Sequence, residues 1–172
     1  MKPIVITGFM GCGKSRIARE VARRLDVGMV DLDDRITQTT GRSPAQLIVE
    51  EGEAAFRAVE TDALREVLQT GGAKVISLGG GAWIQETNRT LVEQYNCTSV
   101  WLDVPFELCW SRIEASDEVR PLGRTRERAL VLYEQRLPIY QLARVHVTIL
   151  QDNFEELVSR IMAISSPDHF IR

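Results

Sequence analysis

The chain has 172 residues, of which 44% are hydrophobic, and this is enough to build the core of one ordinary domain. Its 21 basic and 24 acidic residues leave a net charge of −3, which excludes a broad positive field of the kind that attracts nucleic acid or an anionic membrane surface. Any anionic ligand must therefore be bound by a local cluster of basic groups.

Five short runs rich in β-branched residues indicate strands, at residues 3–7, 28–33, 74–78, 98–104 and 145–150. The segments between them repeat apolar residues at helical spacing. Strands that alternate with helices are typical of a parallel sheet covered on both faces. The sequence therefore predicts an α/β fold, a three-layer αβα arrangement around a five-stranded parallel sheet, in one domain that spans residues 1–172.

Two helices can be read from their apolar stripes. The first follows a glycine-rich loop and places Ile17, Val21 and Leu25 on one side. The second covers about residues 53–68 and is expected to turn its charged side chains outward, namely Glu60, Asp62 and Glu66, with an apolar face made of Phe56, Val59, Ala63, Leu64 and Val67. Residues 111–129 lack apolar periodicity and are expected to form a mobile surface loop.

The loop after the first strand has the pattern of a phosphate-binding loop. Gly8, four further residues and then Gly13, Lys14 and Ser15 match G-x-x-x-x-G-K-[ST] between a buried strand and a helix. We expect the backbone N–H groups of residues 11–15 to point at one anion, reinforced by the positive end of the helix. Lys14 would meet the β- and γ-phosphates, and Ser15 would offer a hydroxyl to Mg²⁺. The alternative is a glycine-rich turn without a ligand.

A phosphate loop alone does not separate a kinase from a switch protein or a motor, but the acids after the second strand narrow the choice. Strand alternation would put Asp31 and Asp33 on one face, at the edge where open α/β sheets bind ligands. One carboxylate could hold the waters of a metal, and the other could orient a substrate hydroxyl and accept its proton. The alternative is that Asp33 or Asp34 only caps the next helix.

Glycines and arginines supply two more signals. Gly79, Gly80 and Gly81 follow the third strand, where the missing side chains let backbone amides approach a small ligand, unless they form only a tight connection. Converging arginines could bind a carboxylate, although each one alone could be a solvated surface residue. The candidates are Arg57, Arg120 and Arg136.

Six segments in this order resemble the shikimate kinase family: "GFMGCGKS", "DLD", "FRAVE", "SLGGGA", "VRPL" and "QRLPIY". The resemblance implies a P-loop kinase fold with sheet order 2-3-1-4-5 and a short lid, similar to nucleoside monophosphate kinases. It also implies transfer of the γ-phosphoryl group of ATP to the 3-hydroxyl of shikimate, in the pathway to chorismate and the aromatic amino acids.

The resemblance further implies roles for individual residues. Asp33 would be the base, and Arg57 and Arg136 would hold the shikimate carboxylate beside Gly79, Gly80 and Gly81. Ser15 would bind Mg²⁺ directly and Asp31 would do so through water. Arg120 would belong to a lid, at about residues 113–126, that closes over ATP. A mobile substrate-binding region would cover about residues 34–62. The nucleotide would contact Gly11, Cys12, Gly13, Lys14, Ser15, Arg16, Arg112 and Arg120.

The sequence departs from the family pattern near the nucleotide. Arg16 stands where threonine is usual and adds a charge there. Leu32 separates the two acids where threonine or serine is common. The expected adenine-side segment, 149–156, lacks a proline, and Arg112 is a candidate for stacking on the adenine.

Two other functions are considered, a related kinase such as gluconate kinase and a non-catalytic nucleotide-binding module. The first would not need two arginines and three glycines arranged for a ring acid, and a guanine-reading N-K-x-D motif of a nucleotide switch is absent. Trp83 could border the substrate or simply pack in the core. We expect a cytoplasmic monomer with three free thiols and with neither nucleic acid nor membrane as a partner, because the sequence shows no leader or spanning run.

Overall fold

The computed structural model describes residues 1–116, 121–123, 125–149 and 154–164. Its centre is a parallel sheet in the order β2-β3-β1-β4-β5. This confirms the predicted sheet and its order. The strands are β1 (Ile4–Thr7), β2 (Gly28–Asp31), β3 (Ala73–Ser77), β4 (Thr98–Asp103) and β5 (Val145–Thr148).

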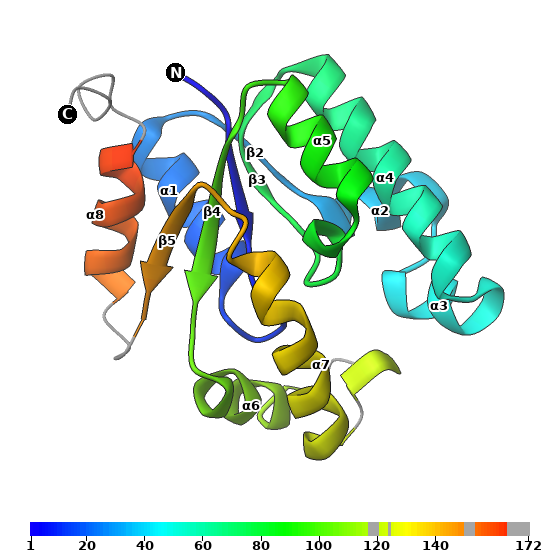
Figure 1. The fold of residues 1–172 in the computed structure, drawn as a ribbon. Coiled ribbons are helices and arrows are strands. Elements are labelled where there is room, and N and C mark those ends of the chain that lie inside the picture. The colour runs from blue at the N-terminus through cyan, green and yellow to red at the C-terminus, as the bar shows by residue number, and fades with distance from the viewer. Residues whose placement is uncertain (117–120, 124, 150–153, 165–172) are drawn as a thin grey trace.

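Helices cover both faces of this sheet (Figure 1). α1 (Lys14–Leu25) and α8 (Phe154–Ile164) pack together on one face, and α4 (Glu53–Thr70) packs beside α5 (Glu86–Gln94) on the other. The remaining elements lie at the carboxyl edge or beyond it: α2 (Leu32–Thr40), α3 (Pro44–Glu51), η1 (Ala82–Ile84), α6 (Phe106–Glu114), η2 (Pro121–Gly123) and α7 (Arg126–Tyr140). The three-layer prediction is confirmed.

The core lies between these layers and explains why the central strands read as continuous apolar runs. All four residues of β1 are buried, as are the first five of β4. A strand with neighbours on both sides and helices on both faces has no solvent-facing side, so its residues do not alternate. The phosphate loop leaves this rigid centre from the end of β1.

Asp31, not Asp33 or Asp34, caps α2. The Asp31 carboxylate accepts hydrogen bonds from the backbone N–H groups of Asp33, at 3.1 Å, and Asp34, at 3.5 Å. β2 therefore ends at Asp31, and Asp33 lies in the first turn of a helix. The prediction that strand alternation puts Asp31 and Asp33 on one face is wrong, because the cap turns the chain into α2 two residues earlier than expected.

The predicted loop at 111–129 is wrong at both ends. α6 continues to Glu114, and α7 begins at Arg126 after Thr125, whose hydroxyl accepts a hydrogen bond from the backbone N–H of Arg128. Inside the expected lid the structure describes the short helix η2, whereas residues 117–120 and 124 lie outside the described part of the chain. Arg120 is therefore not placed.

A search of the described residues for a helix with the length and apolarity of a membrane span finds none. The three cysteines are buried, and none of them forms a disulfide.

Two neighbouring glycines offer a test of the packing where β2 begins. A Cβ on Gly28 would lie 2.7 Å from the Gly72 carbonyl oxygen, whereas a Cβ on Gly72 would meet no atom within 4 Å. We expect Gly28→Ala to lower the free energy of unfolding by about 1–3 kcal/mol. Gly72→Ala should change it by less than about 0.5 kcal/mol. Urea denaturation of both variants measures this, and equal effects would contradict the packing described for β2.

Candidate active site

The phosphate loop is shaped by glycine and by the helix packed beneath it. Gly11 has a φ of +76°, and a Cβ there would lie 2.6 Å from the Cys109 carbonyl oxygen of α6. Only glycine tolerates both the left-handed backbone and this approach. Gly13 is the N-cap of α1 and supplies no side-chain cap, so the first N–H groups of that helix are left for a ligand.

Lys14 and Ser15 stand at the mouth of this loop. The Lys14 ammonium donates to the carbonyl oxygens of Gly8 and Phe9, both at 2.9 Å, and lies 3.8 Å from the Cys12 sulfur. The Ser15 hydroxyl is 3.5 Å from that of Ser77, the last residue of β3. Cys12 is itself buried, and its sulfur accepts from the Lys14 ammonium below the loop.

One cavity of about 1060 Å³ runs from the phosphate loop to the helices α2, α3 and α4. It brings together every predicted site residue that the structure describes except the buried Cys12. These residues are Gly11, Gly13, Lys14, Ser15, Arg16, Asp31, Asp33, Arg57, Gly79, Gly80, Gly81, Arg112 and Arg136. They come from distant parts of the sequence, which meet because the strand ends of a parallel sheet share one edge.

An apolar wall of this cavity was not predicted from the sequence. Pro44, Ala45 and Ile48 of α3 line it. The helix is recognisable from a capping box, in which the Ser43 hydroxyl accepts from the Gln46 N–H and the Gln46 side chain accepts from the Ser43 N–H. The S-x-x-Q pattern followed by apolar residues was the signal that could have found it.

A charged side chain packs against each glycine of the Gly79–Gly81 segment. A Cβ on Gly79 would lie 2.7 Å from the Asp33 carboxylate, and one on Gly81 would lie 2.2 Å from the Arg57 guanidinium. At Gly80 the carbonyl oxygen accepts from Arg136 at 3.2 Å and from the Tyr140 hydroxyl at 2.5 Å. The three glycines therefore bring two guanidinium groups and a carboxylate onto adjacent residues of one backbone segment.

Glu60 is fully buried beside Arg57, so the prediction that it faces outward is wrong. One carboxylate oxygen accepts from Arg57 at 2.7 Å, and the same guanidinium contacts the exposed Glu53 at 3.0 Å. Glu60 lies four residues after Phe56 and four before Leu64, which are both buried. This helical spacing was the signal that could have placed it inward.

Burial raises the pKa of Glu60 to about 7. The Arg57 guanidinium pulls the pKa down, Asp33 pushes it further up, and Arg136 again lowers it. The second Glu60 carboxylate oxygen has no hydrogen-bond partner among the described residues. A carboxyl group in this setting releases its proton near neutral pH.

Two further predicted residues, Arg112 and Arg16, lie beside the phosphate loop. Arg112 donates to the Gly11 carbonyl oxygen at 3.3 Å, and the Arg16 guanidinium lies over the ring of Phe154, 4.2 Å from its centroid. Trp83 is buried and donates its indole N–H to the Ile139 carbonyl oxygen at 3.0 Å. Of the two alternatives for this residue, the structure therefore shows packing in the core. No group of three or more His, Cys, Asp or Glu side chains suited to a metal occurs among the described residues.

Comparison with known proteins assigns the family. Residues 10–165 match the shikimate kinase family. The chain belongs to this family. A shikimate kinase of Ruegeria pomeroyi is 34% identical over 168 residues, which cover 94% of this chain and 84% of that protein. As a member of the shikimate kinases, the chain is an ATP-dependent phosphotransferase.

Solved structures agree with this assignment. The shikimate kinase from Acinetobacter baumannii in complex with shikimate has a TM-score of 0.87 at 30% identity, over 96% of this chain and 93% of that one. A gluconokinase from Sinorhizobium meliloti has a TM-score of 0.62 at 16% identity, over 94% and 90% of the two chains. The gluconokinase therefore shares the fold alone, and the family comparison favours shikimate kinase over that alternative.

The raised pKa of Glu60 makes stability depend on pH. Because folding raises this pKa from 4.5 to about 7, the folded state keeps a proton that the unfolded chain releases. The contribution is complete below about pH 4.5 and is lost as the pH rises through about 7. Relative to Glu60→Gln, we expect the unaltered protein to lose about 2–3 kcal/mol of unfolding free energy between about pH 5 and pH 8.

Urea denaturation at several pH values measures this difference. Glu53→Gln is the matched control, since Glu53 contacts the same arginine but is exposed. It should keep the pH dependence of the unaltered protein. A difference between the unaltered protein and Glu60→Gln that is the same at every pH would contradict the raised pKa.

Proposed function

We propose that this chain transfers the γ-phosphoryl group of ATP to the 3-hydroxyl of shikimate. The observation that carries the proposal is the arrangement of charge in one cavity. A phosphate loop with Lys14 lines one part of it, and two arginines and Asp33 pack on consecutive glycines in the part beside it, where a Cβ on Gly80 would lie 3.3 Å from the Met10 nitrogen of the loop. A ring that carries both a carboxylate and hydroxyl groups matches the second part.

The acceptor end is built to hold an acid and to activate an alcohol. Arg57 and Arg136 approach adjacent glycines and can present paired N–H donors to one carboxylate. Gly79, Gly80 and Gly81 leave room for the ring because they carry no side chains. Asp33 would accept the proton of the 3-hydroxyl as that oxygen attacks phosphorus.

The donor end would align the triphosphate. In phosphoryl transfer the protein mainly positions the reactants and supplies cations around a loosely bonded transition state. The Lys14 ammonium donates to two loop carbonyl oxygens and would bind the β- and γ-phosphates of ATP. The backbone of residues 11–16 would surround the phosphates, and Arg112 would stack on the adenine.

The donor set at Ser15 and Asp31 suits Mg²⁺, which keeps most of its waters and takes one or two protein oxygens. Ser15 offers an exposed hydroxyl at the cavity, and Asp31 lines the same cavity through a carboxylate that caps α2. Ser15 would bind the ion directly and Asp31 would do so through water. The ion would supply positive charge that neutralises the phosphates.

Other parts of the assignment remain predictions. They are the lid at about 113–126 with Arg120, the mobile substrate-binding region at about 34–62, the single domain over residues 1–172, the monomeric state and the cytoplasmic location. Closure of a lid would exclude water, which otherwise competes for the phosphoryl group.

The choice of acceptor is tested by ADP release with MgATP and either shikimate, quinate or gluconate. We expect turnover to depend on shikimate and to fall by about three orders of magnitude in Asp33→Asn, because the amide cannot accept the proton. The control Asp62→Asn changes an exposed carboxylate of α4 that does not line the cavity and should keep most of the turnover. Equal turnover with gluconate would overturn the assigned substrate.

Arg136→Lys tests the carboxylate clamp. Arg136 is buried and already donates to Gly80, so a lysine would lose the second, parallel donor. We expect KM for shikimate to rise by about tenfold or more, with KM for ATP unchanged. Steady-state kinetics in both substrates measures this, and an unchanged KM for shikimate would remove Arg136 from the clamp.

A further inference from the structure

The Arg16 guanidinium makes contacts of a different kind from those of Arg57 and Arg136, which line the same cavity. Its guanidinium lies over the Phe154 ring, 4.2 Å from the centroid, and no hydrogen bond or ion pair holds it within the described part of the chain. Arg57 is instead paired with two glutamates, and Arg136 donates to a carbonyl oxygen. Arg16 thus contributes a cation that no described carboxylate neutralises.

The stacked geometry leaves the donors of Arg16 available. A guanidinium whose carbon lies over an aromatic ring is attracted by the ring's negative face, and this contact uses none of its N–H groups as hydrogen-bond donors to an oxygen. Because Phe154 begins α8 and Arg16 lies in the first turn of α1, the stack joins two packed helices. The side chain is therefore oriented before any nucleotide binds, which lowers the entropic cost of binding.

The order of the strands decides which phosphate Arg16 can reach. Ser15 points toward Ser77 of β3, and next to β3 lies β2, which leads to Asp33 in α2. Arg16 points instead toward α8, which packs against β5 at the opposite edge of the sheet. A γ-phosphate directed at Asp33 therefore leaves the nucleoside end of the triphosphate on the side of Arg16.

We propose that the Arg16 side chain, held over the ring of Phe154, binds the α-phosphate of the nucleotide. This contact adds to the cradle of backbone N–H groups. It rests on the proposed function in one respect, the direction of the triphosphate, which runs from the γ-phosphate at Asp33 to the nucleoside on the side of α8. Phe154 acts as a positioning residue through Arg16.

The affinities for ATP and for ADP, measured by calorimetry without shikimate, test the proposal. We expect Arg16→Thr to weaken both by about tenfold, because the α-phosphate is common to the two nucleotides. The loss should shrink at high salt, since the contact is electrostatic. KM for shikimate should stay unchanged. Arg16→Lys keeps the charge but not the planar stack and should lose part of the affinity.

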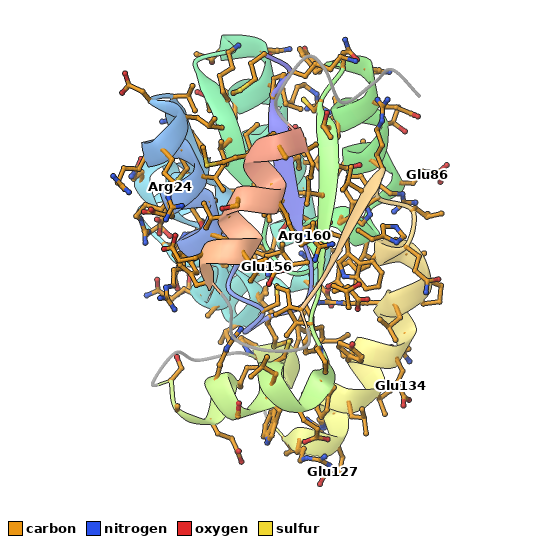
Figure 2. The ribbon with its side chains drawn as sticks, turned by 90° about the vertical axis from the view of Figure 1, so that its left-hand side faces the viewer. Arg24, Glu86, Glu127, Glu134, Glu156 and Arg160 are labelled. Atoms are coloured by element: carbon orange, nitrogen blue, oxygen red, sulfur yellow. The ribbon has the colours of Figure 1, made fainter. Side chains whose placement is uncertain are left out.

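A double-mutant cycle tests the role of Phe154. Phe154→Leu should weaken both nucleotides less than Arg16→Thr does, and the double variant should bind no more weakly than Arg16→Thr. The matched control is Arg24→Gln. Arg24 also joins α1 to α8, through Glu155 at 2.6 Å, and it projects from α1 in Figure 2 without touching the cavity. It should leave both affinities unchanged, which separates nucleotide binding from helix docking.

Three results would overturn the proposal. Unchanged affinity in Arg16→Thr would remove the contact, and weaker binding of ATP alone would place it at the γ-phosphate. An equal loss in Arg24→Gln would assign the effect to the docking of α8. A protein that binds ATP as expected but does not turn over shikimate would overturn the proposed substrate and leave the contact of Arg16 in place.

Discussion

The site depends on one constraint: a buried charged group must have a partner of opposite charge. Here such groups must also fit against a backbone segment that carries no side chains. Glu60 is completely buried, and it is tolerated because Arg57 donates to it at 2.7 Å. The same guanidinium occupies the space where a Cβ of Gly81 would stand. The glycines, the ion pair and the carboxylate of Asp33 are therefore one packed unit, and a side chain at Gly79 or Gly81 would displace its charges.

The phosphate loop, which lies beside Gly80, can bind charge with backbone groups instead of side chains. The loop before α1 uses glycine conformations and leaves the helix without a side-chain cap, so N–H groups remain available for phosphate. Lys14 donates to two carbonyl oxygens of the same loop. In the phosphate-binding part of the cavity and in the acceptor-binding part, the charged groups thus have separate partners. Both parts can bind anions inside a protein of net charge −3.

Sequence patterns predicted the parts whose cause is local. The strands, the phosphate loop and the first helix follow from periodicity and glycine placement, and each strand begins within one residue of the predicted position, although β2 and β5 end two residues early. The errors occur at the ends of elements. Asp31 ends β2 by capping α2, and α6 and α7 extend into the predicted loop. The roles of the site residues remain predictions, although the structure brings the described ones to one cavity.

The sequence by itself determined the sheet, the phosphate loop and the kinds of charged group available, because these depend on neighbours within a few residues. Only the tertiary structure decided which charges meet. Arg57, Glu60 and Arg136 come from α4 and α7, and they converge because both helices pack at the carboxyl edge around the glycine segment. The helical period could have placed Glu60 on the buried face of α4, but its pairing with Arg57 and its raised pKa depend on that through-space packing.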